Sequence, residues 1–396
     1  MSALKLSTND FCKNKLFAAA KILVVDDSAT IRNVISAVLG ESGVQQIMQA
    51  EDGRDALNKL AEFTPDLVIL DIAMPNMDGL EFCEYLRNSQ MSVREVPIIV
   101  MTGMNKVDER MRALRVGVSS ILYKPIDPEA LLDRVYMHLQ ESRLIGKIKR
   151  GEESTGEDLQ IAAKMQEILL PSAEIIAECN EKYKLAINSI YRPSEVFGGD
   201  YWLVKPINDD LVAVFMADFS GHGVSSAVYT FRVHKFLREY VCYYQSPLEV
   251  LEELNRAVHS MFPVGKYLTC VLGFIDIKNN TLTYSAAGHP PMLLVDGENV
   301  QNLDCSGFPL GPYADAVYDN KVVSFGAKSM LIAYSDALIE ANSRDEFIFT
   351  PESLILEVQD MTTQGNDAIY ARIFVKVNYG KHQFDDDMTL LCVART

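Results

Sequence analysis

The feature that most constrains the fold is a series of short apolar runs in the first third of the chain, each followed by a polar residue. The runs lie at residues 22–25, 66–70, 96–101 and 121–123. They are rich in β-branched residues, and amphipathic stretches such as residues 30–39 separate them. Short buried strands that alternate with helices are typical of a parallel sheet with crossover helices. We therefore expect an α/β domain with a doubly wound, flavodoxin-like parallel sheet.

The residues that follow these runs carry groups suited to holding a phosphoryl group. They are Asp26, Asp27, Asp71, Thr102 and Lys124. We expect them to converge, because ligands of parallel sheets bind beyond the carboxyl ends of the strands. A phosphoryl group on a carboxylate requires a divalent cation, a side-chain cation and a hydroxyl group around its oxygens. Adjacent aspartates repel each other in a dry site unless a cation is present, so a purely structural role for the Asp26-Asp27 pair would be costly.

After residue 184 the pattern changes to strands with hairpin signals. Strand-like runs lie at residues 211–217, 269–276, 281–286 and 330–334. Asn279-Asn280 predicts a tight turn between two of these runs. Helical stretches intervene at residues 225–243 and 247–261. This mixture predicts an α/β sandwich with antiparallel strands.

The domain limits follow from a polar segment with two glycines at residues 151–158, which is typical of a linker. The helical patterns on either side of it fit a homodimer seam or packing on their own domains, and the sequence leaves both open. We expect the first domain at residues 20–141, a helical linker at 142–171 and the sandwich at 172–396.

Carboxylates mark the ends or beginnings of strand-like runs in the second half of the chain. They are Asp200, Asp218, Asp336, Asp386 and Asp387. No Ser-His-Asp order, reactive cysteine motif or glycine-rich phosphate loop accompanies them. Carboxylates without a protein nucleophile indicate hydrolysis by metal-activated water. Soft ligands are absent from this set, which favours Mg²⁺ or Mn²⁺ over zinc.

Composition argues against several classes of protein. The 396 residues include 54 acidic and 37 basic side chains, a formal net charge of −17, so we expect no nucleic-acid partner. The seven cysteines are scattered without a C-x-x-C pair, which argues against a disulfide framework. No run approaches the roughly 20 apolar residues of a membrane span, and we expect a cytoplasmic protein without a membrane partner.

Four motifs of the first domain resemble those of response-regulator receiver domains: "VVDDS", "LDIAMPNMDG", "MTG" and "KP". The resemblance covers about residues 21–140. It implies that Asp71 accepts a phosphoryl group from a cognate histidine kinase. It also implies one Mg²⁺ among Asp27, Asp71 and the backbone carbonyl of Ala73, with Asp26 acting through water.

Two local expectations follow from this resemblance. Lys124 would precede a cis peptide bond at Pro125, as in this family. Ile121 occupies the position of the usual aromatic switch residue, although Tyr123 lies nearby. This departure favours output through the helix after Asp127 rather than through an aromatic rotamer.

Six motifs of the second half resemble those of SpoIIE/RsbU-type PPM phosphatases: "FGGDYW", "ADFSGHGVSSA", "SAAGHPPMLL", "GFPLG", "AYSDALIEA" and "DDDMTLLCVAR". The metal positions that the resemblance implies are Asp200, Asp218, Phe219, Asp336, Asp386 and Asp387. Two Mg²⁺ or Mn²⁺ ions would share the carboxylate of Asp218, and the backbone carbonyl of Phe219 would complete the second site. Asp386 is preferred over Asp387, because the family's ligand is the first member of the pair before "MT".

Three further residues near these motifs are interpreted one by one. His222, close to Asp218, would serve as a general acid or orient the metal loop by a hydrogen bond, and the sequence supports both equally. His289 in "AGHPP" is predicted to be structural. Ala337 replaces the glycine that usually follows the metal-binding aspartate, and it would strain the loop only if that position needs a positive φ.

The combined layout resembles the RssB-like regulators of pseudomonads, which act on partner-switching pathways. It implies a two-component response regulator whose output is metal-dependent dephosphorylation of phosphoserine or phosphothreonine on a protein. The implied substrate is a phosphorylated STAS-type anti-sigma-factor antagonist. The alternative is a catalytically silent adaptor that uses the PPM domain as a phosphorylation-controlled binding surface. Retention of the metal carboxylates argues against that alternative.

Overall fold

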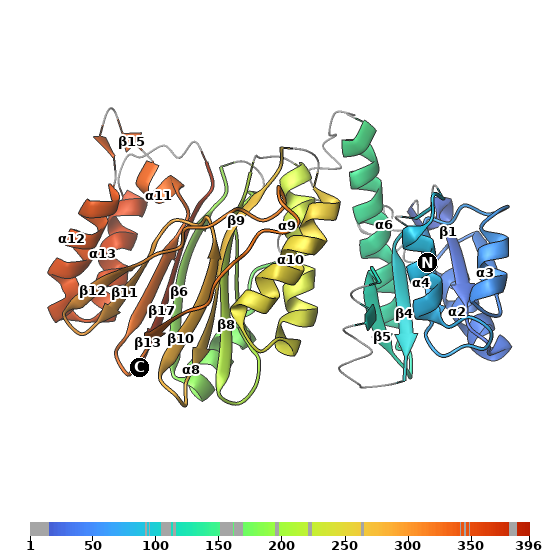
Figure 1. The fold of residues 1–396 in the computed structure, drawn as a ribbon, viewed down its shortest axis with the longest axis horizontal. Helices are drawn as coiled ribbons and strands as arrows, with labels where there is room; N and C mark the ends of the chain where they lie inside the picture. Colours follow the sequence, from blue (N-terminus) through green and yellow to red (C-terminus); the bar gives the residue numbers. More distant parts are fainter. Residues whose placement is uncertain are drawn as a thin grey trace, which may run out of the picture. The chain divides into compact units, whose positions relative to one another are not determined.

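The computed structural model describes residues 16–91, 93–94, 96–103, 112–113, 116–150, 161, 169–194, 198–220, 224–262, 265–340, 342–343, 346–347, 349–379 and 386–396. The chain divides into two compact units, Met1–Glu153 and Ser154–Thr396 (Figure 1). Most of the predicted linker lies outside the described residues, so the predicted domain limits remain predictions. Within the described ranges, no helix combines the length and apolar character needed to cross a membrane.

The described part of the first unit is built on one parallel sheet with the strand order β2-β1-β3-β4-β5. The strands are β1 Lys21–Val25, β2 Gln46–Ala50, β3 Leu67–Asp71, β4 Ile98–Thr102 and β5 Ser120–Tyr123. Four of them match the predicted runs, and the doubly wound parallel sheet is confirmed. β2 was not predicted, because its sequence QIMQA is only partly buried at the edge of the sheet and contains no apolar run.

Helices cover both faces of this sheet. They are α2 Ala29–Glu41, α3 Gly53–Lys59, α4 Gly79–Asn88 and α6 Pro128–Arg150. α2 and α6 pack against one face through residues such as Ile35 and Val135, and α3 and α4 pack against the other through Ala56 and Phe82. α6 continues past residue 141, the predicted end of this domain, without a break.

The second unit is a sandwich of two antiparallel sheets, with the orders β13-β10-β9-β8-β7 and β12-β11-β14-β17-β6. The strands of the first sheet are β7 Tyr201–Pro206, β8 Leu211–Phe219, β9 Leu268–Asp276, β10 Thr281–Ala287 and β13 Lys321–Ser324. Those of the second are β6 Leu185–Arg192, β11 Met292–Asp296, β12 Asn299–Leu303, β14 Met330–Tyr334 and β17 Met388–Arg395. The predicted sandwich is confirmed, and Asn280 adopts φ 55° in the turn between β9 and β10.

Alternation along the strands divides their side chains between two cores. Val214 and Val271 of one sheet face Leu331 and Leu391 of the other, and these residues belong to the core between the sheets. Neighbouring positions such as Ile332 belong to a second core, under the helices that cover the outer face.

Helices cover the outer faces of both sheets, so the second unit has four layers (Figure 1). α12 Pro351–Met361 and α13 Asn366–Tyr379 cover one sheet, and α9 Val224–Tyr240 and α10 Pro247–Met261 cover the other. α8 Ala173–Tyr183 contributes Cys179 and Tyr183 to the core between the sheets. The shorter elements are η1 Val241–Tyr243, α11 Ala337–Glu340, β15 Asn342–Ser343, β16 Glu346–Phe347 and η2 Thr362–Gln364.

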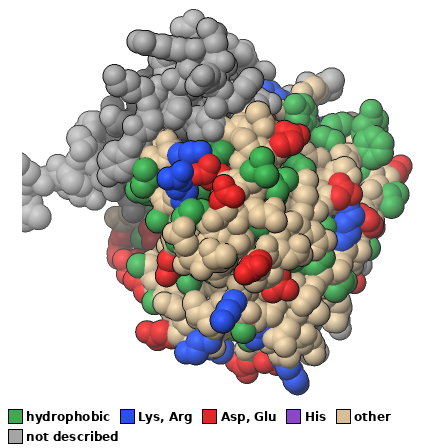
Figure 2. Space-filling view, turned by 90° about the vertical axis from the view of Figure 1, so that its left-hand side faces the viewer, with side chains coloured by type: hydrophobic (Ala, Val, Ile, Leu, Met, Phe, Trp, Pro, Cys, Tyr) green, Lys and Arg blue, Asp and Glu red, His purple; other side chains and the backbone are tan. Residues whose placement is uncertain are grey.

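The side of the second unit that carries α12 and α13 faces the viewer in Figure 2. Acidic and basic side chains are interspersed there with hydrophobic ones. Between the two helices, Glu357 forms ion pairs with Arg372 at 2.5 Å and Lys376 at 2.6 Å. A surface of mixed sign does not attract a polyanion over a long range.

Substitution of Gly79 by alanine should destabilise the first unit. A Cβ atom at this position would lie 2.3 Å from the backbone oxygen of Asp71 and 3.0 Å from Cα of Ile72. Because backbone atoms cannot rotate away, we expect Gly79→Ala to lower the free energy of unfolding by about 1–3 kcal/mol in urea titrations followed by circular dichroism.

Gly40→Ala provides the matched control. Gly40 lies in α2, and a Cβ atom there would meet nothing within 4 Å. This substitution should stabilise the helix by about 0.5–1 kcal/mol. Equal effects of the two substitutions would contradict the close packing at Gly79.

Candidate functional site

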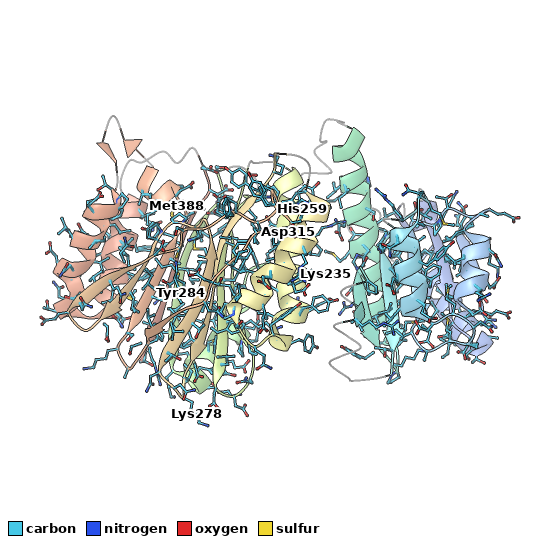
Figure 3. All side chains as sticks on the ribbon, viewed as in Figure 1. Lys235, His259, Lys278, Tyr284, Asp315 and Met388 are labelled. Atoms are coloured by element: carbon cyan, nitrogen blue, oxygen red, sulfur yellow. The ribbon has the colours of Figure 1, made fainter. Side chains whose placement is uncertain are left out.

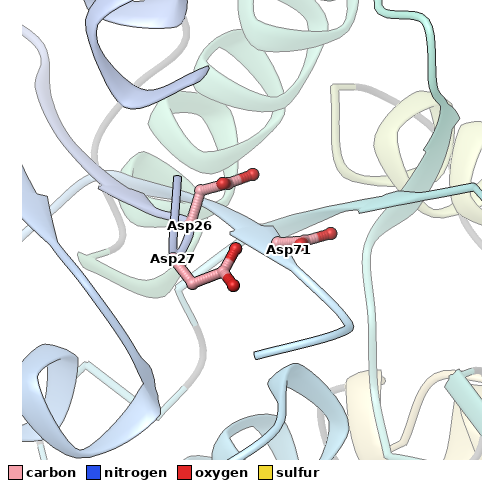
Figure 4. A group of neighbouring side chains, drawn as sticks. All are labelled: Asp26, Asp27 and Asp71. Atoms are coloured by element: carbon pink, nitrogen blue, oxygen red, sulfur yellow. The ribbon is translucent and has the colours of Figure 1, made fainter. Parts of the chain in front are cut away.

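Three carboxylates meet at the carboxyl edge of the parallel sheet. Asp26 and Asp27 directly follow β1, and Asp71 is the last residue of β3. Their oxygens lie within 4.8 Å of one another, and their side chains gather around one space in Figure 4. Asp26 and Asp71 are buried, whereas Asp27 is exposed. The set offers hard oxygen ligands of the kind that Mg²⁺ takes in proteins.

Lys124 supplies a positive charge to the same site. Its Nζ lies 2.9 Å from Oδ1 of Asp71 and 3.0 Å from Oδ2 of Asp26. Its backbone N–H donates to the carbonyl of Thr102, the buried last residue of β4, at 2.9 Å. The expected cis peptide bond between Lys124 and Pro125 is present. The structure thus brings together all five residues that follow the apolar runs, and their individual roles remain predictions.

The electrostatics of this site are those of a carboxylate held partly out of water. Burial raises the pKa of the Asp71 carboxyl, and the hydrogen bond and charge of Lys124 oppose that shift. Burial of Lys124 acts to lower the pKa of its ammonium, but Asp71 and Asp26 outweigh it and the pKa is raised. Lys124 therefore remains charged and paired with the two aspartates.

The other receiver-type positions lie around this site. Ala73 is exposed in the loop that follows β3. Ile121 is buried in the core of the first unit, whereas the side chain of Tyr123 is 46% exposed. The carboxylate of Asp127 accepts from the N–H of Ala130 in the first turn of α6, and output through that helix remains a prediction.

Antiparallel pairing explains how distant carboxylates meet in the second unit. Tyr201 pairs with Ala217, so Asp200, one residue before β7, lies beside Asp218 near the end of β8. In the other sheet Tyr334 pairs with Leu390, which sets the start of β17 beside the end of β14. Asp336 lies two residues after the end of β14, and Asp386 lies two residues before the start of β17.

A pocket of about 420 Å³ lies where these strand ends meet. Its lining includes the carboxylates of Asp218, Asp336 and Asp386. In Figure 3, Met388 at the start of β17 and Lys278 in the turn between β9 and β10 mark opposite ends of the sandwich. The pocket therefore lies at the end of the sandwich away from that turn.

Asp200 is the buried member of this set. It is 2% exposed, and neither of its carboxylate oxygens has a hydrogen-bond partner among the described residues. Burial raises the pKa of Asp200, and the negative charge of Asp218 raises it further. The hydroxyls of Thr389 and Ser335 oppose this shift without reaching hydrogen-bond geometry. A buried carboxylate without a donor is costly, and a divalent cation would satisfy it.

The carboxylates of the second unit are more widely spaced than those of the first. Within the described ranges, only Asp26, Asp27 and Asp71 bring three acidic side chains within 4.8 Å of one another. The residues around the pocket nevertheless fit hard cations, because they combine an unsatisfied buried carboxylate with three further carboxylates.

An aromatic cluster fixes the end of β8. The ring of Phe219 stacks on Tyr229 at 5.5 Å between centroids and meets Phe262 edge-on at 4.9 Å. The next residue, Ser220, donates its N–H to the carbonyl of Tyr267. These contacts hold the backbone beside Asp218, and the role of the Phe219 carbonyl remains a prediction. His222 lies outside the described residues.

The two members of the Asp386-Asp387 pair differ in their surroundings. Asp386 is exposed and lines the pocket. Asp387 is 4% exposed, and its oxygens accept hydrogen bonds from Ser194 and from the N–H of Gly199. A metal role for Asp387 stays a prediction, and its surroundings are those of a carboxylate whose oxygens already accept hydrogen bonds from the protein.

His289 and Ala337 also have defined surroundings. His289 lines the pocket and is buried, and burial lowers its pKa to about 4, so its ring is neutral. Its Nδ1 lies 2.8 Å from the carbonyl of Pro290. Ala337 begins α11, is buried and does not have a positive φ, so the strain that a positive φ would cause at this position does not arise. Tyr267 and Thr269 line the pocket but carry no sequence signal for it.

Stability of the metal-free protein should depend on pH through Asp200. With its pKa raised above the ordinary 3.8, folded Asp200 retains a proton that the unfolded chain has released. The free energy of unfolding therefore falls as pH rises above about 4. Asp200→Asn cannot titrate and should show a shallower decline.

Urea titrations at several pH values, followed by fluorescence of the buried Trp202, measure this difference in the second unit. Trp202 is the chain's single tryptophan and lies two residues from Asp200. Parallel declines in the wild type and the variant would contradict the assigned shift.

Comparisons with known proteins agree with this geometry. Residues 22–136 match the family described as response regulator receiver domain, and residues 208–396 match stage II sporulation protein E (SpoIIE). The regulator of RpoS of Escherichia coli (strain K12) is 26% identical over 312 residues, which cover 75% of this chain and 89% of that protein. The phosphoserine phosphatase RsbP of Bacillus subtilis (strain 168) is 28% identical over 192 residues, or 47% of this chain and 46% of that protein.

A solved structure shares the fold of the second unit. The SiaA-PP2C domain of Pseudomonas aeruginosa superposes with a TM-score of 0.52 at 22% identity, over 60% of this chain and 96% of that domain. The family matches divide the chain in the same order as the two units of the structure. The chain therefore joins a response regulator receiver domain at residues 22–136 to a SpoIIE-type domain at residues 208–396.

Proposed function

We propose that this chain removes phosphate from phosphoserine or phosphothreonine on a protein, and that phosphorylation of Asp71 controls the reaction. The observation that carries the proposal is the buried carboxylate of Asp200, which has no hydrogen-bond donor among the described residues and lies beside a pocket lined by three further carboxylates. Such a site is unfavourable without cations and suited to holding them.

Two Mg²⁺ or Mn²⁺ ions would each be bound by a different set of these carboxylates. When bound, such ions lower the pKa of a water molecule and neutralise the phosphoryl oxygens. Asp200 and Asp218 lie beside each other and would hold one ion, with Asp218 shared between the two. Asp336 and Asp386, which line the same pocket, would hold the other.

The other side chains of the site would support or orient the metal-binding carboxylates rather than bind the metal themselves. The packed rings of Phe219, Tyr229 and Phe262 would hold the backbone beside Asp218 in place. His222 would protonate the leaving oxygen or orient the metal loop, as the sequence suggests. The site therefore needs no protein nucleophile.

Exposed aromatic side chains at the rim favour a protein substrate over a small molecule. Tyr267 lines the pocket and is 42% exposed. Phe308 and Tyr313 are about 60% exposed and contact each other at 5.6 Å between ring centroids. The neighbours of Phe308 pack against Gly288, which lines the pocket. Exposed apolar groups beside a polar pocket suit contact with another protein surface.

The identity of the substrate is proposed from the relatives. One is named a phosphoserine phosphatase and another a regulator of RpoS. We infer a phosphorylated STAS-type anti-sigma-factor antagonist as the substrate, and a cognate histidine kinase as the source of the phosphoryl group on Asp71. Docking would depend on a specific interface, because the chain carries a net charge of −17 and does not attract phosphopeptides electrostatically.

A homodimer through the linker helices stays one of two alternatives. In α6, Leu131, Val135 and Leu139 pack into the core of the receiver domain. That part of the helix is therefore occupied by its own domain, and a dimer seam would be confined to later residues.

Catalysis is tested by phosphate release from a phosphoserine-bearing protein and from a generic phosphomonoester in the presence of Mn²⁺. Asp218→Asn should reduce turnover of both by more than about 100-fold, because loss of a supporting residue alone costs about 10- to 100-fold. Asp360→Asn, at an exposed position on α12, is the matched control and should match the wild type. Wild-type protein without metal-dependent phosphate release would favour the adaptor alternative.

Control by the receiver domain is tested with a small acyl-phosphate donor. The donor should change turnover of the wild-type phosphatase and leave Asp71→Asn unaffected, because only the wild type can form the acyl phosphate. Glu62→Gln, which removes the negative charge of an exposed side chain on the same domain, should respond like the wild type. Equal turnover of wild type and Asp71→Asn with and without the donor would remove the proposed control.

A further inference from the structure

We propose that Asp387 is a positioning residue that holds the metal-binding carboxylates in place and does not itself bind metal. The proposal rests on the proposed phosphatase function. It concerns how the carboxylates that would hold the ions are fixed before any ion binds. Its basis is a set of contacts that link Asp387 to the immediate neighbours of three of those carboxylates.

One oxygen of Asp387 is occupied by Ser194. Oδ1 accepts from the backbone N–H of Ser194 at 2.6 Å and from its hydroxyl at 2.9 Å. Ser194 lies two residues beyond β6, which pairs with β17 along its whole length. This pair of hydrogen bonds fixes the orientation of the Asp387 carboxylate.

The other oxygen holds the segment that leads to Asp200. Oδ2 accepts from the backbone N–H of Gly199, the residue directly before Asp200. A Cβ atom on Gly198 would lie 2.3 Å from the same oxygen, so the backbone approaches the carboxylate closely enough to exclude a side chain there. The position of Asp200 is therefore set by Asp387.

The backbone of Asp387 connects to the other two carboxylates. Its N–H donates to Oδ1 of Asp386 at 2.8 Å, which orients that side chain. Its carbonyl accepts from the hydroxyl of Ser335, the residue before Asp336, at 3.1 Å. The same hydroxyl accepts from the N–H of Thr389 at 2.8 Å, which ties β17 to the end of β14.

The contrast with Asp200 separates the two kinds of carboxylate. Both side chains are almost fully buried. Among the described residues, Asp200 has no hydrogen-bond donor on either oxygen, whereas Asp387 has donors on both. A cation would compete with those donors at Asp387 and meet no such competition at Asp200. Carboxylates that support metal ligands through hydrogen bonds commonly set metal affinity.

The test compares Asp387→Asn with Asp386→Asn in the full chain, with Mn²⁺ binding measured by calorimetry. Asparagine keeps the shape of Asp387 but offers only one acceptor oxygen for its donors. We expect Asp387→Asn to bind as many ions as the wild type, with a dissociation constant raised about 10- to 100-fold. Turnover should recover at high Mn²⁺. Asp386→Asn should bind one ion fewer than the wild type.

Two controls keep the outcome decisive. Ser194→Ala removes one donor to Asp387 without touching a carboxylate, and it should weaken Mn²⁺ binding in the same direction by less than tenfold. If Asp387→Asn does not fold, the Mn²⁺ affinity of Ser194→Ala tests the proposal in its place. A residue that only stabilises the fold would lower the urea midpoint of the metal-free protein and leave Mn²⁺ affinity unchanged.

The proposal is overturned if Asp387→Asn binds one ion fewer, since Asp387 would then be a ligand, or if affinity is unchanged in the variants that fold. If the wild type is active, either of these results overturns only the role of Asp387 and leaves the proposed phosphatase function unaffected. A wild type that binds no Mn²⁺ and releases no phosphate would instead overturn the proposed function.

Discussion

Carboxylates that lie close together out of water repel one another, and both domains are organised around that repulsion. In the receiver domain, Lys124 places its ammonium between Asp26 and Asp71, and the two ion pairs offset part of the cost. In the SpoIIE-type domain, Asp200 has no hydrogen-bond donor among the described residues, and Asp218 adds a further negative charge. The first site is thus partly neutralised by Lys124, whereas the described surroundings of Asp200 offer its carboxylate no such compensation.

Strand geometry decides where such groups can gather. In the parallel sheet, all strands end at one edge, so residues far apart in sequence meet there without special loops. In the antiparallel sandwich, paired strands run in opposite directions, so the residue before one strand lies beside a residue near the end of its neighbour, as Asp200 does beside Asp218. Two different sheet types therefore reach the same result, a cluster of acidic groups on a rigid support.

The sequence predicted the elements with strong local signals. The apolar runs of β1, β3, β4 and β5 and the two long helical stretches before β9 were identified within a few residues. β2 was missed because an edge strand with one fully buried residue has no clear pattern. The motifs also identified Asp218, Asp336 and Asp386 as candidate site residues, and the structure shows that all three line one pocket.

What the sequence could not supply is the set of contacts made across the fold. The family resemblance favours Asp386 over Asp387 as a ligand, but no sequence pattern predicts the hydrogen bonds that Ser194 and Gly199 donate to Asp387. His289 is predicted to be structural, but it also lines the pocket, because the segment that crosses from β10 to β11 brings it next to strand ends that are distant in the chain. Local sequence patterns indicate backbone conformation and burial, but they do not indicate which side chains form hydrogen bonds between distant parts of the chain.

The three rings of Phe219, Tyr229 and Phe262 join elements from two layers. Phe219 ends β8, Tyr229 belongs to α9, and Phe262 directly follows α10. Close-packed rings transmit displacement because they leave no free space to absorb it. A small shift of α9 or α10 would therefore move the backbone one residue from Asp218, so the outer surface of these helices is mechanically coupled to the pocket that Asp218 lines.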